Sequence, residues 1–146
     1  MSQIIWAVTL ALFAFVVPAR ADIIVQELEF RPGIGERPGV IFGRLTHQGA
    51  VPDQLIAVES PDARIELHTH ELQGNVMRMR RVTGFSLAPG EDLLLTSGGH
   101  HLMVFDLLRK QDKMPLRLTF RFENAPAVTT DIAVPAKAEA KRHHHH

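Results

Sequence analysis

The sequence predicts an all-β fold, an antiparallel sandwich or barrel in a single domain. Runs rich in β-branched and aromatic residues recur every eight to twelve residues or so, a spacing typical of such folds. Clusters of Gly, Pro, Asn and Asp separate the runs, as turns require. After residue 21 the apolar residues nowhere keep the helical spacing i, i+3, i+4, i+7 for three turns.

The first half of the chain alternates strand-like runs with turns. The β-branched start of 23–28 predicts a strand, and 31–39, with two prolines and three glycines, predicts a loop. Strand character resumes at 40–46 and is interrupted by the Gly- and Pro-containing turn 47–53. Two short strands follow, 54–60 and 64–70, on either side of Pro61-Asp62-Ala63.

The second half repeats this pattern. Turn residues at 73–75, 88–91, 97–99 and 124–126 separate the remaining runs. The predicted strands there are 79–87, 93–96, 101–108, 116–122 and 128–134. No internal repeat and no second domain are visible. The last residues, 136–146, are small or charged and lack an apolar pattern, so no regular structure is predicted for them.

Length and charge narrow the class of protein. With 146 residues, 45% of them hydrophobic, the chain can bury one core. Sixteen basic residues balance sixteen acidic ones. The concentrated positive charge expected of a protein that binds nucleic acid is missing, so nucleic acid is not a predicted partner.

The N-terminus predicts export. Residues 4–17 are nearly all apolar, Pro18 interrupts them, and Ala19-Arg20-Ala21 has the small-x-small pattern of a signal-peptidase site. The apolar run is shorter than the roughly 20 residues of a membrane-spanning helix. We therefore predict a signal peptide, 1–21, cleaved after Ala21, and a mature domain, 22–135, that is not inserted in the membrane.

The chain contains no cysteine. This excludes thiol-disulfide chemistry, cysteine proteases and disulfide-framework folds. In an oxidising compartment, thiolate metal ligands would compete with disulfide formation. Imidazole and thioether ligands avoid that competition, so an exported site for a soft metal would use histidine and methionine.

Histidine and methionine are concentrated in one stretch, 68–103. It holds the histidines and methionines His68, His70, His100, His101, Met77, Met79 and Met103. Imidazole and thioether together are the ligand set that soft Cu(I) prefers. Because side chains alternate along a strand, His68 and His70 share one face, opposite Leu67, and are expected to point outward. By the same alternation, His101 and Met103 share a face.

The spacing resembles a known family. Ten residues separate His68 from Met79, and twenty-one separate Met79 from His101-Leu102-Met103. This pattern resembles the H-x10-M-x21-H-x-M motif of the periplasmic PCu(A)C-type copper(I) chaperones. The resemblance extends over about residues 40–134 and includes the segments 65–68, 76–80, 87–90 and 98–103.

The resemblance implies a fold, a site and a role. The fold would be a cupredoxin-like β-sandwich, and the ligands of one Cu(I) ion would be His68, Met79, His101 and Met103. The role would be to carry copper in the bacterial periplasm without catalysis. The recipient would be a subunit of cytochrome c oxidase, which receives the metal for its copper centres, or another copper chaperone.

Other readings remain open from the residues alone. His70 and the terminal histidines His143, His144, His145 and His146 are possible accessory ligands for Cu(II), although the last four also fit a remnant of an expression tag. A cupin-like metalloenzyme is an alternative, since His68-Thr69-His70 resembles its His-x-His element. An exported structural or adhesive sandwich without metal is another.

Overall fold

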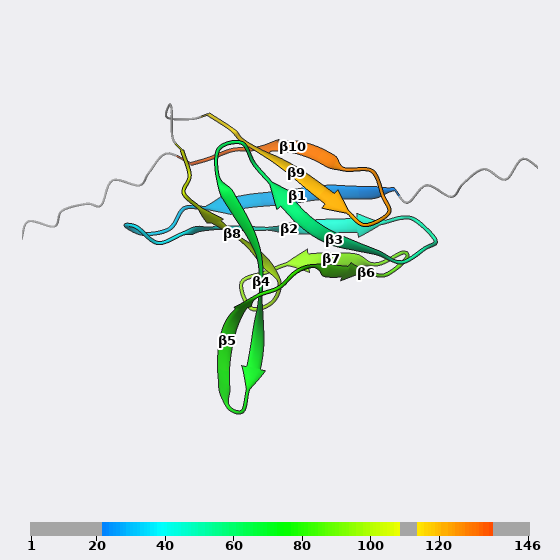
Figure 1. The fold of residues 1–146 in the computed structure, drawn as a ribbon, viewed down its shortest axis with the longest axis horizontal. Coiled ribbons are helices and arrows are strands. Elements are labelled where there is room, and N and C mark those ends of the chain that lie inside the picture. The colour runs from blue at the N-terminus through cyan, green and yellow to red at the C-terminus, as the bar shows by residue number, and fades with distance from the viewer. Residues whose placement is uncertain (1–21, 109–113, 136–146) are drawn as a thin grey trace, which may run out of the picture.

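The computed structural model describes residues 22–108 and 114–135, which form ten strands (Figure 1). The predicted signal peptide and the histidine-ended tail lie outside the described residues. The strands are β1 (Ile23–Arg31), β2 (Gly39–His47), β3 (Asp53–Glu59), β4 (Arg64–Gln73), β5 (Val76–Arg81), β6 (Phe85–Leu87), β7 (Asp92–Leu95), β8 (His101–Phe105), β9 (Leu116–Phe122) and β10 (Val128–Ile132).

The strands form two antiparallel sheets. The first has the order β1-β2-β8-β4-β5, with β7 also paired to β2, and the second has the order β10-β9-β3-β6. The prediction of a single-domain, all-β sandwich is therefore confirmed. None of the described segments is a helix of the length and apolarity that crossing a membrane requires.

The core lies between the two sheets. In the first sheet, Leu102 of β8 is the register partner of both Ile41 on β2 and Leu67 on β4, and all three are buried. Their apolar side chains share one face because side chains alternate along each strand. The second sheet contributes, among others, the fully buried Leu55 and Phe120. The opposite face of β4 and β8 therefore does not pack between the sheets, and its side chains can form a functional site.

The prediction of one strand over 79–87 is wrong. The chain leaves the first sheet after Arg81 and enters the second at Phe85, so two strands replace the predicted one. The amide of Val82 still donates to the carbonyl of Leu67. Gly84 then passes so close to Gln54 that an added Cβ would lie 2.7 Å from its Nε2. This close approach lets β6 pair with β3.

Other strand boundaries differ by a few residues. The first strand extends to Arg31 through a bulge at Glu27, whose φ is 55°. The prediction of a strand to residue 108 is wrong, since β8 ends at Phe105 and Asp106 has a φ of 53°, which extended backbone does not allow. The last strand ends at Ile132 rather than at residue 134.

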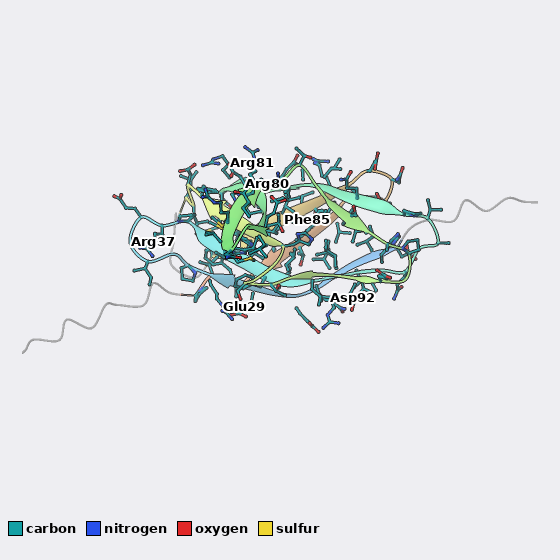
Figure 2. All side chains as sticks on the ribbon, turned by 90° about the horizontal axis from the view of Figure 1, so that it is seen from below. Glu29, Arg37, Arg80, Arg81, Phe85 and Asp92 are labelled. Carbon is teal, nitrogen blue, oxygen red and sulfur yellow. The ribbon has the colours of Figure 1, made fainter. Side chains whose placement is uncertain are left out.

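The hairpin of β4 and β5 extends away from the two layers (Figure 1). All six residues of β5, the edge strand of its sheet, are exposed. Arg80 and Arg81 lie at the surface (Figure 2). Exposed charges on an edge oppose pairing with another chain. The first sheet therefore ends in an exposed, positively charged edge strand.

Candidate metal centre

The register of three strands gathers the predicted ligands on the outer face of the first sheet. His68 on β4 lies opposite His101 on β8, and His70 on β4 lies opposite Met79 on β5. Residues directly opposite each other in an antiparallel pair project to the same face. Met103 follows His101 by two residues on β8 and shares this face. The four predicted ligands therefore face the same side of the sheet.

His101 and Met79 are in direct contact. The Nδ1 of His101 lies 2.9 Å from the carbonyl oxygen of Gly99, which only accepts, so Nδ1 carries the hydrogen. Burial lowers the pKa of His101, against a smaller raising effect of the Gly99 hydrogen bond, and thus favours the neutral ring. Its Nε2 then carries a lone pair and no hydrogen, and it lies 3.2 Å from the Sδ of Met79. Two electron-pair donors face each other with no hydrogen between them.

His68 is the second imidazole of the cluster. Its ring centroid lies 6.0 Å from that of His101, and its Nε2 lies 3.0 Å from the Oε2 of Glu66. Its Nδ1 is buried and has no hydrogen-bond partner. The predicted face is correct, but the expectation of an outward, solvated side chain is not, since His68 is only 9% exposed. Phe105 covers this face, 6.4 Å from His68 between ring centroids.

The two methionines differ in exposure. Met103 is 6% exposed and lies opposite Glu66, whereas Met79 is 49% exposed on the edge strand. His68 and His101 are buried as well. Met79 is therefore the ligand through which the cluster meets solvent.

The remaining histidines and methionines of the stretch fall into two groups. His70 belongs to the cluster, because its ring centroid lies 5.0 Å from that of His101 and its buried Nδ1 has no partner. Met77 is exposed further out on the hairpin, opposite Leu72. His100 lies elsewhere, with its ring 4.4 Å from that of Phe85. The terminal histidines lie outside the described residues.

Sequence reasoning missed Glu66 and Gly99 as parts of the site. Glu66 precedes His68 by two residues, so strand alternation was the signal that could have found it. The contact of Gly99 is made by its backbone, which leaves no signal in the residue type. Across the described part of the chain, no three His, Cys, Asp or Glu side chains converge as a metal-holding group. A metal held at this cluster would therefore need the thioethers.

Fold and site together define a β-sandwich with a cluster of imidazole and thioether groups on the outer face of one sheet. The chain belongs to the LpqE-like family, whose model, described as "Putative lipoprotein LpqE-like", matches residues 18–134. The predicted resemblance to the PCu(A)C type is also confirmed, because solved PCuAC domains are similar to this chain. No curated protein matches the chain.

The solved structures similar to this chain include three structures of PCuAC domains. The copper-bound PCuAC domain from PmoF2 is 25% identical, with 79% of this chain and 93% of that domain covered and a TM-score of 0.62. The apo form of the PmoF2 domain is 26% identical, with coverages of 80% and 92% and a TM-score of 0.62. The apo PCuAC domain from PmoF1, at 23% identity, coverages of 79% and 94% and a TM-score of 0.63, supports the fold alone.

Proposed function

We propose that this protein is a copper(I) carrier that binds one Cu(I) ion through His68, Met79, His101 and Met103. The observation that supports this most is the 3.2 Å contact between Nε2 of His101 and Sδ of Met79. With the Nδ1 hydrogen given to Gly99, neither atom can donate to the other. Such a contact has no stabilising role in a sandwich without metal, whereas a cation between the two lone pairs would bind both.

The ligand chemistry favours Cu(I) and a carrier. Two thioethers and two neutral imidazoles are soft, uncharged donors, which favour Cu(I) over Cu(II). The similar PmoF2 domain was solved with copper bound. A carrier needs no reacting group beside the metal, and we assign no catalytic residue. Family membership also favours this role over the cupin-like enzyme and over the metal-free adhesive sandwich.

Release of copper would begin at Met79. Because Met79 is half-exposed while the other three ligands are buried, a partner's ligand can approach the metal there before the remaining donors leave. Ligand exchange of this kind needs no change of protonation at a thioether. The same exposure would serve loading of the protein.

We propose the bacterial periplasm as the compartment, after cleavage of the signal peptide behind Ala21. The apolar segment 4–17 and the lipoprotein description of the family support export. The recipient we propose is a subunit of cytochrome c oxidase or another copper chaperone. This choice rests on the resemblance to the PCu(A)C type.

Cu(II) would bind at accessory sites. We propose His70, whose buried Nδ1 has no partner, and the terminal segment 143–146. Electron paramagnetic resonance of protein loaded with one equivalent of Cu(II) tests both. We expect deletion of 143–146 to reduce the signal and a further His70→Ala change to reduce it again. A spectrum unchanged by the deletion would contradict the tail site, and one unchanged by His70→Ala would contradict the other.

The site assignment is tested by removing one imidazole. In an anaerobic titration against a chromophoric Cu(I) chelator, wild-type protein should bind one Cu(I). His101→Ala should weaken binding by more than the ~10–100-fold typical for loss of a supporting outer residue. The adjacent His100→Ala is the matched control, because His100 packs on Phe85 away from the cluster, and its affinity should equal that of the wild type. Equal affinity for His101→Ala would refute the assignment.

A further inference from the structure

We propose that Glu66 is a positioning residue of the copper site, which directs Nδ1 of His68 to the metal by taking the hydrogen of Nε2. The carbonyl of Gly99 fixes the opposite choice in His101, which would bind through Nε2. The two imidazoles would therefore use different nitrogens. The inference rests on the proposed function in naming copper as the ligand, and its geometry stands on the metal-free protein.

The carboxylate of Glu66 is held in place from both sides. Its side chain is 12% exposed on the face of β4 that carries His68, and it lies opposite Met103. Its Oε1 accepts from Arg64 and lies 3.7 Å from a guanidinium nitrogen of Arg81. Its Oε2 lies 3.0 Å from Nε2 of His68. The arginines therefore occupy one oxygen and leave the other to the imidazole.

The charge of Glu66 fixes the direction of the hydrogen bond. The guanidinium groups of Arg64 and Arg81 lie beside its Oε1, and positive charges this close favour the ionised carboxylate. An ionised carboxylate only accepts, so the hydrogen lies on Nε2 of His68. When Nε2 carries the single hydrogen of an imidazole, Nδ1 carries the lone pair, and it is this atom that is buried without a partner.

The same reasoning gives the opposite tautomer for His101. The carbonyl of Gly99 accepts from Nδ1 at 2.9 Å, which leaves the lone pair on Nε2, facing Met79. In both rings the nitrogen that would reach the metal is the one without a hydrogen, and the other nitrogen is tied to an oxygen. A ligating histidine tied in this way has a fixed ring orientation and greater basicity.

Glu66 also affects the charge of the site. The four proposed ligands are neutral, so bound Cu(I) would leave one positive charge among buried groups. Burying an uncompensated charge is costly. The carboxylate of Glu66, joined to His68 by a hydrogen bond, places a negative charge on this face beside the proposed ligands. We therefore expect it to strengthen binding beyond its effect on ring orientation.

The tautomers can be measured without copper. Long-range ¹H–¹⁵N correlation spectra of the apo-protein at about pH 8, above the ordinary histidine pKa, separate the two forms. We expect an Nε2–H ring for His68 and an Nδ1–H ring for His101. In the Glu66→Ala variant, His68 should lose its preference for the Nε2–H tautomer, while His101 should keep its preference for the Nδ1–H tautomer. An Nδ1–H ring for His68 in the wild type would overturn the inference.

Affinity provides the second readout. In the Cu(I) competition titration, Glu66→Ala should weaken binding by about 10–100-fold. Glu66→Gln keeps an oxygen that accepts a hydrogen bond from His68. This variant should therefore lose less Cu(I) affinity and retain the wild-type tautomer of His68. Glu71→Ala is the matched control, because Glu71 pairs with Arg80 on the same hairpin but faces away from the cluster. We expect it to bind like the wild type.

The outcomes separate the inference from the proposed function. A wild-type protein that binds no Cu(I) would contradict the proposed function, whatever the tautomers. Wild-type binding that Glu66→Ala leaves unchanged would overturn the inference and leave the proposed function standing. Should Glu66→Ala not fold, the wild-type tautomers and the affinity of Glu66→Gln decide.

Discussion

The double variant Met79→Leu/Met103→Leu is expected to lose more than ~100-fold in Cu(I) affinity, beyond the loss of a supporting outer residue, while it stays folded. Leucine and methionine have similar volumes, and such exchanges usually cost less than about 1.5 kcal/mol of stability. Leucine has no lone pair, so both sulfur donors are lost. Competition with a chromophoric Cu(I) chelator measures the affinity, and thermal unfolding measures the stability.

The control for this variant is Met77→Leu. Met77 lies on the same strand and the same face as Met79 but is more exposed and has no described contact with the imidazoles. Its Cu(I) affinity should equal that of the wild type. Undiminished affinity in the double variant would contradict a thioether site. It would favour a purely imidazole site of the cupin-like kind.

Replacing Asp53 by alanine is expected to cost on the order of 3 kcal/mol of stability. Asp53 is 6% exposed at the start of β3, and its carboxylate accepts from the backbone amides of Gln54, Asn124 and Ala125. It thereby ties the turn between β9 and β10 to the second sheet. Alanine would leave these amides without their acceptor, and chemical denaturation measures the loss.

The contribution of Asp53 should depend on pH. Burial acts to raise its pKa, but the three amide hydrogen bonds, helped by nearby His47, outweigh burial and hold the pKa below the ordinary 3.8. A carboxyl group whose pKa is lower in the folded state stabilises the fold at pH values above its unfolded-state pKa. This stabilisation is lost as the pH falls through the folded-state pKa. The difference between wild type and Asp53→Ala should therefore shrink below about pH 4.

The control for Asp53 is Asp131→Ala. Asp131 is paired with Arg117 at the surface of β9 and β10, and exposed ion pairs contribute little to stability. Its replacement should change the denaturation midpoint far less than Asp53→Ala at neutral pH. Equal effects would show that Asp53 acts as a surface charge and not as a buried acceptor.

The strands of this fold could largely be predicted, but the pairing of one segment could not. Leu116–Phe122 forms a strand as predicted because its apolar and polar residues alternate strictly, and the apolar ones are buried. Within the segment 79–87 the one residue that interrupts a strand pattern is Gly84, and a glycine at such a position is equally typical of a bulge within one strand. The change of sheet depends on tertiary packing, namely the close approach of Gly84 to Gln54 and the burial of Phe85.

The strand face on which each site residue lies could be predicted from the sequence, but the burial of these residues could not. Alternation correctly placed His68 with His70 and His101 with Met103 on shared faces. The near-complete burial of His68 depends on Phe105, which in turn lies under the guanidinium of Arg64. Such cover comes from a neighbouring strand, which the local sequence does not specify. The hydrogen bond of the Gly99 carbonyl could not be predicted either, because a backbone carbonyl is present in every residue.

X-ray absorption spectroscopy of the Cu(I)-loaded protein tests the central claim most directly. The measurement counts sulfur and nitrogen donors around the metal in solution. We expect sulfur from Met79 and Met103 together with nitrogen from His68 and His101, and loss of the sulfur contribution in the double leucine variant. A spectrum of the wild type that contains only nitrogen and oxygen donors would contradict the proposed site.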